Sequence, residues 1–173
     1  MAKTANATGA KRAKVELVVS SAMVTALASL TTAESIDISS IVKSISGGDL
    51  TRVVEKEYVV GDSAAIETYD PQLIYSDLVI VFLYTNGKDT LGTDTIDVGE
   101  ILDELAVYTT SNLSPQIVWS MAGGAVGDEE RLTGATDTRI VGLTQPQGGV
   151  DTTGKVQRTL TLSVQTVTKA TIT

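Results

Sequence analysis

The stretch Gln157-Arg158-Thr159-Leu160-Thr161-Leu162-Ser163-Val164-Gln165 decides the fold class of this 173-residue chain. Three apolar residues alternate in it with four neutral polar ones, which are Thr159, Thr161, Ser163 and Gln165. A period of two is typical of a β-strand with one apolar and one polar face. No charged residue lies between Arg158 and Lys169. The pattern therefore predicts a mainly β fold that ends in a two-faced strand over residues 157–167.

The composition excludes most catalytic chemistry. Hydrophobic residues make up 42% of the chain and aromatic residues only 4%, so the core must be aliphatic. The chain has no cysteine and no histidine, which excludes disulfides, thiol chemistry, Ser–His–Asp triads and histidine-bound zinc. The glycine-rich residues 122–127 lack the Lys-Ser/Thr of a phosphate-binding loop and are followed by three acids, so they predict a turn. We expect a protein that is not an enzyme and has no cofactor or metal.

Charge is distributed unevenly along the chain, whose formal net charge is −8. Four cations and no acid precede Glu16, and they are Lys3, Lys11, Arg12 and Lys14. An acidic remainder disfavours tight binding to phosphate backbones. We predict a flexible basic arm over residues 1–14 that is solvated or docks on an acidic neighbouring subunit, with a nucleic-acid arm as the alternative. Residues 15–173 are expected to form one domain.

Residues 13–30 resemble a signal peptide superficially. Glu16, Ser20, Ser21 and Thr25 interrupt the apolar stretch and argue against that interpretation. No run approaches the roughly 18 consecutive apolar residues of a membrane helix. The sequence therefore predicts a soluble chain with no membrane anchor.

Short apolar runs separated by turn residues predict further strands, over residues 15–19, 36–41, 51–60, 78–84, 116–121 and 139–143. The run 78–84 is apolar throughout and indicates a strand buried on both faces. Residues 51–60 have no clean apolar face, which is typical of an edge strand or of a hairpin that meets a partner chain. Residues 63–72 and 87–95 are predicted to be loops. Trp119 is expected in the core, packed against the helix described next, with a surface anchor as the alternative.

One clear helix is predicted from Asp97 to about Tyr108. Asp97 and Glu100 have the spacing of a capping box. Apolar residues then follow at helical spacing, and they are Val98, Ile101, Leu102 and Leu105. The acids Asp97, Glu100, Asp103 and Glu104 favour a solvated helix face over a metal site. Residues 23–30 are ambiguous between a helix and an extended segment.

The order of these features resembles the tail tube proteins of long-tailed bacteriophages. The resemblance covers most of residues 15–170 and rests on short strings: Val59-Val60-Gly61-Asp62, Leu83-Tyr84-Thr85, Pro115-Gln116-Ile117-Val118-Trp119, one acid-capped helix and a Thr-rich last strand. It implies a β-sandwich or partial barrel with one flanking α-helix, an extended N-terminal arm and a long inter-strand loop at about Gly47 to Asp70. It also implies stacked hexameric rings whose inner sheets join into a barrel through which DNA passes without specific binding.

The resemblance assigns candidate roles to residues. The candidate lumen-facing residues are Thr159, Thr161, Ser163 and Gln165. The candidate inter-ring contacts are Lys11, Arg12, Lys14, Arg52, Glu55, Lys56, Glu57 and Tyr58. The implied partners are further copies of the chain and tape-measure, tail tip and tail terminator proteins. The implied location is the virion tail, assembled in the host cytoplasm.

Other classes of protein share part of this pattern. One group comprises other self-assembling β proteins: a contractile secretion-system tube ring, a capsid decoration protein or a pilus-like subunit. A second group comprises carbohydrate-binding or ligand-binding sandwiches and enzymes that work through carboxylates. The uncharged polar face and the absence of histidine favour the self-assembling proteins.

Overall fold

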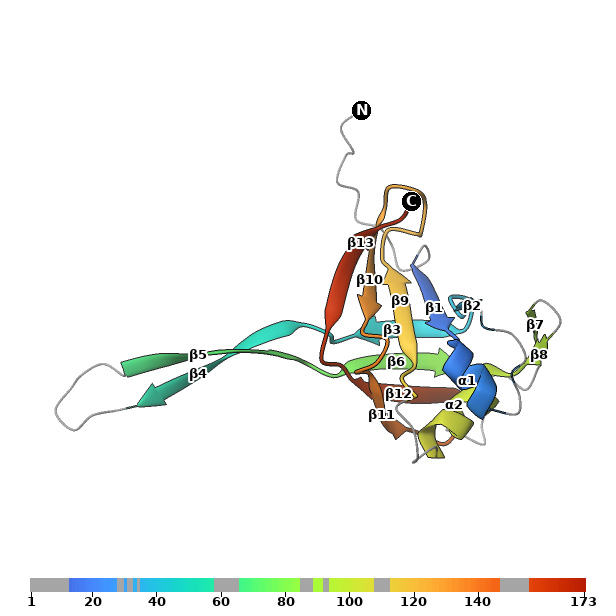
Figure 1. Cartoon of the computed structure of the whole chain (residues 1–173), viewed down its shortest axis with the longest axis horizontal. Coiled ribbons are helices and arrows are strands. Elements are labelled where there is room, and N and C mark those ends of the chain that lie inside the picture. The colour runs from blue at the N-terminus through green and yellow to red at the C-terminus, as the bar shows by residue number, and fades with distance from the viewer. Residues whose placement is uncertain are drawn as a thin grey trace.

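A computed structural model describes residues 13–27, 30, 33, 35–57, 66–84, 89–91, 94–107, 113–146 and 156–173. Two antiparallel sheets face each other, and two helices lie at one end of the pair (Figure 1). The expected mainly β fold with a flanking helix is confirmed. The ambiguous residues 23–30 contribute to a second, shorter helix.

The first sheet has five strands in the order β13-β10-β9-β1-β2. These are β13 (Val167–Thr171), β10 (Glu129–Thr133), β9 (Gln116–Ser120), β1 (Lys14–Val18) and β2 (Ser35–Asp37). Strands β1, β2 and β9 lie where the sequence predicts strands, whereas β10 has no counterpart among the predicted strands.

The second sheet has four strands in the order β11-β12-β6-β3. These are β11 (Arg139–Leu143), β12 (Gln157–Ser163), β6 (Leu78–Leu83) and β3 (Val42–Ser46). Its strands run across those of the first sheet (Figure 1). Strand β3 was not predicted, and together with β11 it forms the two edges of this sheet.

Aliphatic side chains fill the space between the sheets, as the composition requires. Leu17 and Ile117 from the first sheet and Ile80, Leu160 and Leu162 from the second are 2% exposed or less. Burial of such side chains is worth roughly 1.5–3 kcal/mol each. Trp119 is buried in the same cluster.

The two helices close one end of the core. In α1 (Ser21–Ala26) the Ser20 hydroxyl accepts a hydrogen bond from the Met23 amide, and Met23 is fully buried. In α2 (Val98–Val107) Asp97 Oδ1 accepts from the Gly99 amide at 2.8 Å. The stripe that includes Ile101 and Leu102 is buried, so the predicted helix and the capping role of Asp97 are confirmed.

A long hairpin projects from the body of the molecule (Figure 1). Its strands β4 (Leu50–Glu57) and β5 (Ile66–Tyr75) pair with each other and with no other strand of the described chain. The turn that precedes it needs glycine, because Gly47 has φ 88° and an added Cβ would lie 1.9 Å from the Asp77 carbonyl oxygen.

Two predicted loops are strands. Residues 63–72 fall largely within β5, which the sequence obscures because Asp70-Pro71 reads as a turn. Pro71 lies where the ladder is irregular, between the pairs Arg52–Leu73 and Val54–Tyr69, so its missing N–H removes no regular ladder bond. Residues 87–95 contain a small hairpin of β7 (Asp89–Leu91) and β8 (Asp94–Ile96).

Two predicted strands differ from their expected form. The closing strand is shorter than the predicted 157–167, because β12 ends at Ser163 and the chain bends at Gln165. Strand β13, which begins at Val167 in the other sheet, was not predicted. The run 78–84 is not buried on both faces. Leu78, Ile80 and Phe82 are buried, whereas the side chains between them are only partly covered.

Candidate channel wall and assembly surfaces

The outward face of the four-stranded sheet is uncharged over most of its area, and we call it the neutral wall. Its registered rows are Ser46–Val79–Thr161–Gly142, Ser44–Val81–Thr159 and Leu83–Gln157. Directly opposed residues on neighbouring strands point to the same face, so hydroxyls alternate with branched apolar groups across it. Such a surface offers weak, evenly spread polar contacts and no fixed charge.

Charged residues occur only at the margins of the neutral wall in the described chain. Arg139 lies opposite Ser163 at one end, where its guanidinium donates to the Thr136 and Thr138 carbonyls and to Ser114. Lys43 lies on the edge strand β3 and is exposed. The interior of the wall is therefore free of charge.

Three of the four candidate lumen residues share this wall. Thr159, Thr161 and Ser163 alternate with the buried face of β12 and are half-buried. Gln165 lies beyond the end of β12, in the exposed bend that leads to β13. The strand geometry thus groups three of these residues and separates the fourth.

Both edges of the four-stranded sheet lack a further strand in the described chain. Each edge strand also carries a register shift. In β3 it lies between Val42 and Ser44, so Lys43 is the extra residue; in β11 it lies between Ile140 and Gly142, so Val141 is the extra residue. β-Bulges of this kind increase local twist and are common at sheet edges.

A buried arginine fixes α2 to the back of the neutral wall. Arg158 is 1% exposed, and its guanidinium donates to Asp103 Oδ2 at 3.1 Å and Oδ1 at 2.6 Å. Its Nε donates to the Thr144 carbonyl at 2.9 Å. Asp103 lies on the predicted solvated helix face and is 53% exposed, and its ion pair with Arg158 is an additional role that was not predicted. The only signal in the sequence is a lone arginine at an apolar-face position of β12.

The candidate inter-ring residues are dispersed in the described chain. The Lys14 ammonium lies 2.8 Å from Glu16 Oε1, and this hydrogen bond raises the pKa of Lys14 above its ordinary value. Arg52 is exposed on β4 opposite Leu73. Glu55, Lys56 and Glu57 belong to β4. Lys11, Arg12 and Tyr58 lie outside the described residues.

The five-stranded sheet has a charged outward face. Glu16 pairs in register with Asp37, and Lys14 and Glu130 lie nearby. Several of these groups interact, since the negative charges of Glu16, Asp37 and Glu130 all help to raise the pKa of Lys14. This face therefore contrasts with the neutral wall on the opposite side of the core.

A second charged group lies on the inner side of the same sheet, beyond the area that the four-stranded sheet covers. The Lys169 ammonium and the Arg131 guanidinium lie 2.5 Å and 3.0 Å from the Glu129 carboxylate. The hydrogen bond from Lys169 holds the pKa of Glu129 below its ordinary value, with a smaller contribution from Arg131.

Within the described ranges, no group of three or more acidic side chains is arranged to hold a metal ion. The acids of α2 have other roles, since Asp97 caps the helix and Asp103 binds Arg158. Residues 122–127 form the predicted turn, which joins β9 to β10.

None of the helices in the described part of the chain is both long and apolar enough to cross a membrane.

Comparison with known proteins gives a likeness in fold. No protein-family model and no curated protein matches the chain. A chain from the sheath–tube complex of an extracellular contractile injection system, PVC, in its extended state, is similar with a TM-score of 0.60 at 14% identity, over 95% of this chain and 92% of that one. Two chains of the anti-feeding prophage are similar over 99% of both chains. One is from the tube-terminating cap (TM-score 0.59, 17% identity) and one from the six-fold symmetrised baseplate (TM-score 0.61, 11% identity). The chain has the fold of components of these particles.

Proposed function

We propose that this protein is a structural subunit that self-assembles into stacked hexameric rings and so forms the tube of a phage tail or a phage-tail-like particle. The observation that carries the proposal is the neutral wall, which is bounded by two open edge strands. The fold that the chain shares with components of contractile injection systems supports it. The role is architectural and needs no catalytic group.

In this proposal the edge strands join neighbouring copies. Strand β3 of one copy pairs with β11 of the next, so the four-stranded sheets continue into one barrel and the neutral wall becomes its lining. The uncharged Thr, Ser and Val side chains of the wall add no phosphate affinity, and the basic residues Lys43 and Arg139 would lie near the joints between copies. Thr159, Thr161 and Ser163 would then face the channel, and DNA would pass without specific binding.

The remaining surfaces would connect rings and accessory proteins. Residues 1–14 and the β4–β5 hairpin are the proposed inter-ring elements, and tape-measure, tip and terminator proteins are the proposed partners. Assembly would take place in the host cytoplasm, and the finished particle would be a tail or tail-like tube. Residues 15–173 would form the single tube-forming domain.

Electron microscopy of the purified chain tests the proposal directly. We expect rings or tubes with a central channel in negative stain, and six-fold symmetry in averaged end views. A monodisperse monomer that does not polymerise at any concentration or salt would contradict self-assembly. Rings of another symmetry would contradict the six-fold symmetry but not self-assembly.

Cysteine labelling tests which face lines the channel, because the natural chain has no cysteine. In Thr161→Cys tubes we expect reaction with a small maleimide and protection from a large polymer-linked maleimide. The matched control is Thr168→Cys on the exposed strand β13, which should react with both. Equal reactivity of the two positions with the large reagent would overturn the lumen assignment.

A contractile injection-system tube is the second candidate, and the origin of the three similar chains favours it. The genes beside this one distinguish the candidates. Capsid and terminase genes would support a phage tail, whereas sheath and baseplate genes without capsid genes would support an injection system.

A further inference from the structure

Methionine supplies all the sulfur in this chain, because the sequence has no cysteine. The three methionines are Met1, Met23 and Met121, of which Met1 lies outside the described residues. Met23 belongs to α1 and is fully buried in the core. Met121 directly follows β9 and is 50% exposed, which is unusual for a methionine beside a packed core. Of the two described methionines, Met121 is therefore the one that a dissolved oxidant can reach.

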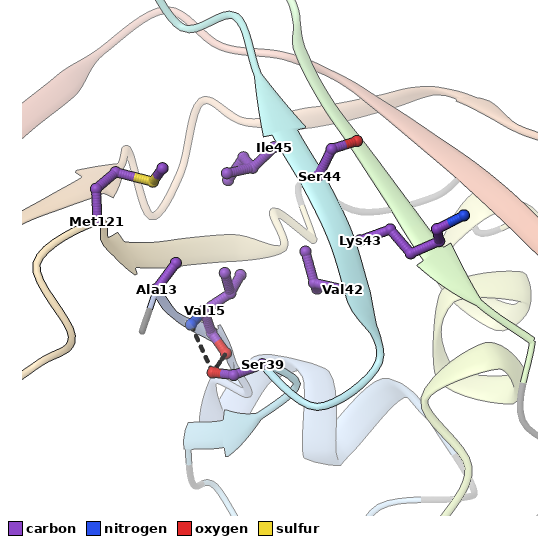
Figure 2. A pocket seen from close by; sticks show the side chains of 8 residues that line it. All are labelled: Ala13, Val15, Ser39, Val42, Lys43, Ser44, Ile45 and Met121. Atoms are coloured by element: carbon purple, nitrogen blue, oxygen red, sulfur yellow. Dashed lines mark hydrogen bonds between the residues drawn. The ribbon is translucent and has the colours of Figure 1, made fainter. Parts of the chain in front are cut away.

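Two cavities, of about 170 Å³ and 200 Å³, have Met121 in their walls. Figure 2 shows the thioether of Met121 directed toward Ile45 in the first cavity, whose lining also includes Val15 and Val42. Both cavities are large enough to hold molecules of the size of water or hydrogen peroxide. A small molecule in either cavity therefore meets the side chain of Met121.

The second cavity adds a hydrogen-bond donor to this side chain. Its lining includes Trp119, Met121 and Arg131, and Arg131 lies directly opposite Trp119 in the sheet. Arg131 Nη2 donates to Glu129 Oε1 at 3.0 Å. A guanidinium has five N–H groups, so this bond leaves donors for an oxygen atom inside the cavity. The thioether and a cationic donor thus share one small, solvent-connected space.

We propose that Met121 is a modification site that reacts with hydroperoxides and that Arg131 assists the reaction. The sulfur lone pair forms a bond to the distal oxygen of the hydroperoxide while the O–O bond breaks. The proton of the hydroperoxide moves to the departing oxygen, which leaves as an alcohol, or as water when the oxidant is hydrogen peroxide. The sulfur is oxidised to a sulfoxide and the hydroperoxide is reduced. Arg131 donates a hydrogen bond to the departing oxygen, on which negative charge develops.

The product changes the chemistry of the first cavity. A thioether is apolar, whereas a sulfoxide is polar and its oxygen accepts hydrogen bonds. Val42 and Ile45 cannot supply such bonds, so the oxidised side chain turns toward water and loses its contacts in the cavity. Sulfoxides of methionine can be reduced again, so the change is reversible. The oxidised free subunit should therefore be less stable than the reduced one until the sulfoxide is reduced.

Peptide mass spectrometry of the free subunit after treatment with hydrogen peroxide tests the reactivity of Met121. We expect Met121 to gain one oxygen atom at least about ten times faster than Met23, the internal control. The same treatment should lower the denaturation midpoint of the natural chain and leave that of Met121→Leu unchanged. Equal rates of oxidation at Met121 and Met23 would overturn the proposal.

A pair of matched variants tests the part played by Arg131. Arg131→Gln should slow the oxidation of Met121 by about threefold or more, because the donor to the departing oxygen is lost. The control is Lys169→Gln, which removes the other cation bound to Glu129 and does not line the cavity, so it should leave the rate unchanged. An undiminished rate in Arg131→Gln would overturn the role of Arg131. These measurements use the free subunit, so their outcomes are separate from those that test the proposed tube.

Discussion

The two outward faces of the sandwich cover the same core and differ in charge. The five-stranded sheet presents Lys14, Glu16, Asp37 and Glu130, whose charges interact. The neutral wall presents hydroxyls and valines in register. A need for solubility alone would favour charged residues on both outward faces equally. The difference fits the proposed channel lining on one side of the core and a face that meets solvent or a charged partner on the other.

The largest expected effect separates the two sides of β12. Leu162→Ala should lower the free energy of unfolding by about 3 kcal/mol, because it removes a fully buried side chain and leaves a cavity. Thr161→Ala, one residue away on the neutral wall, should change it by less than about 0.5 kcal/mol. Denaturant unfolding of the free subunit measures both. A loss at Thr161 as large as that at Leu162 would show that the wall contributes to folding as well as to assembly.

The next effect concerns the anchor behind the wall. Asp103→Ala should cost about 2 kcal/mol, because it leaves the buried Arg158 guanidinium without its carboxylate. Asp103 is 53% exposed, so solvent screens part of the pair and the cost falls below that of a fully buried one.

A double variant, Asp103→Ala with Arg158→Met, is the control for this prediction. It removes both charges and should recover part of the loss seen in equilibrium unfolding. Val107→Ala on the exposed side of the same helix should be close to neutral. If the double variant is as unstable as the sum of the single ones, the ion pair is not the cause.

A cation on the neutral wall should convert it to a DNA-retaining surface. Thr161→Lys tubes assembled with short duplex DNA should retain at least about ten times more nuclease-protected DNA than the natural protein, because the lysine repeats around every ring. The control is Thr168→Lys on the exposed strand β13. DNA bound by this variant should remain accessible to nuclease and be digested. Protection by Thr168→Lys, or none by Thr161→Lys, would place the wall outside the channel.

The smallest effect is a pH dependence that arises from the charged group on the inner side of the five-stranded sheet. The pKa of Glu129 is lowered in the folded state, so its contribution to stability is present above the ordinary value of 4.5 and is lost as the pH falls through the folded pKa. The Glu129→Gln variant should therefore be less stable than the natural protein above pH 4.5, and the difference in stability between the two should narrow as the pH drops below 4.5. Thermal unfolding across that range measures it. A constant offset at all pH values would contradict the assignment.

The parts of the fold that were predictable are those whose pattern is local. In β12 and α2, ten residues or fewer are enough to show both the period of the element and the face that is buried. The boundaries were less predictable. The alternation of β12 continues through Val164 and Gln165, beyond the end of the strand at Ser163, so the pattern places the end of the strand too late.

The missed strands depend on distant partners. β10 is Glu-Glu-Arg-Leu-Thr, and its charged positions are tolerated because the sheet extends beyond the facing one. β5 holds Pro71 at a break in the ladder that only pairing with β4 defines. The Arg158–Asp103 pair joins residues 55 positions apart, and the lone arginine on the apolar face of β12 indicates a buried charge without indicating its partner. For the candidate site, the neutral face of β12 was predictable from its own alternation. The residues that β3, β6 and β11 add to the neutral wall were not, because they depend on strand pairing.

The bulges at Lys43 and Val141 affect which strands can pair with the sheet edges before assembly begins. In the proposed assembly, free copies accumulate before a tube grows, and in the described chain the four-stranded sheet of each copy has two edges without a further strand. A bulged edge is a poor template for an arbitrary strand, because the hydrogen-bond ladder is out of step at one place. Only a strand with a matching irregularity completes it. In the proposed assembly, this selectivity of the edge strands would disfavour premature fibres.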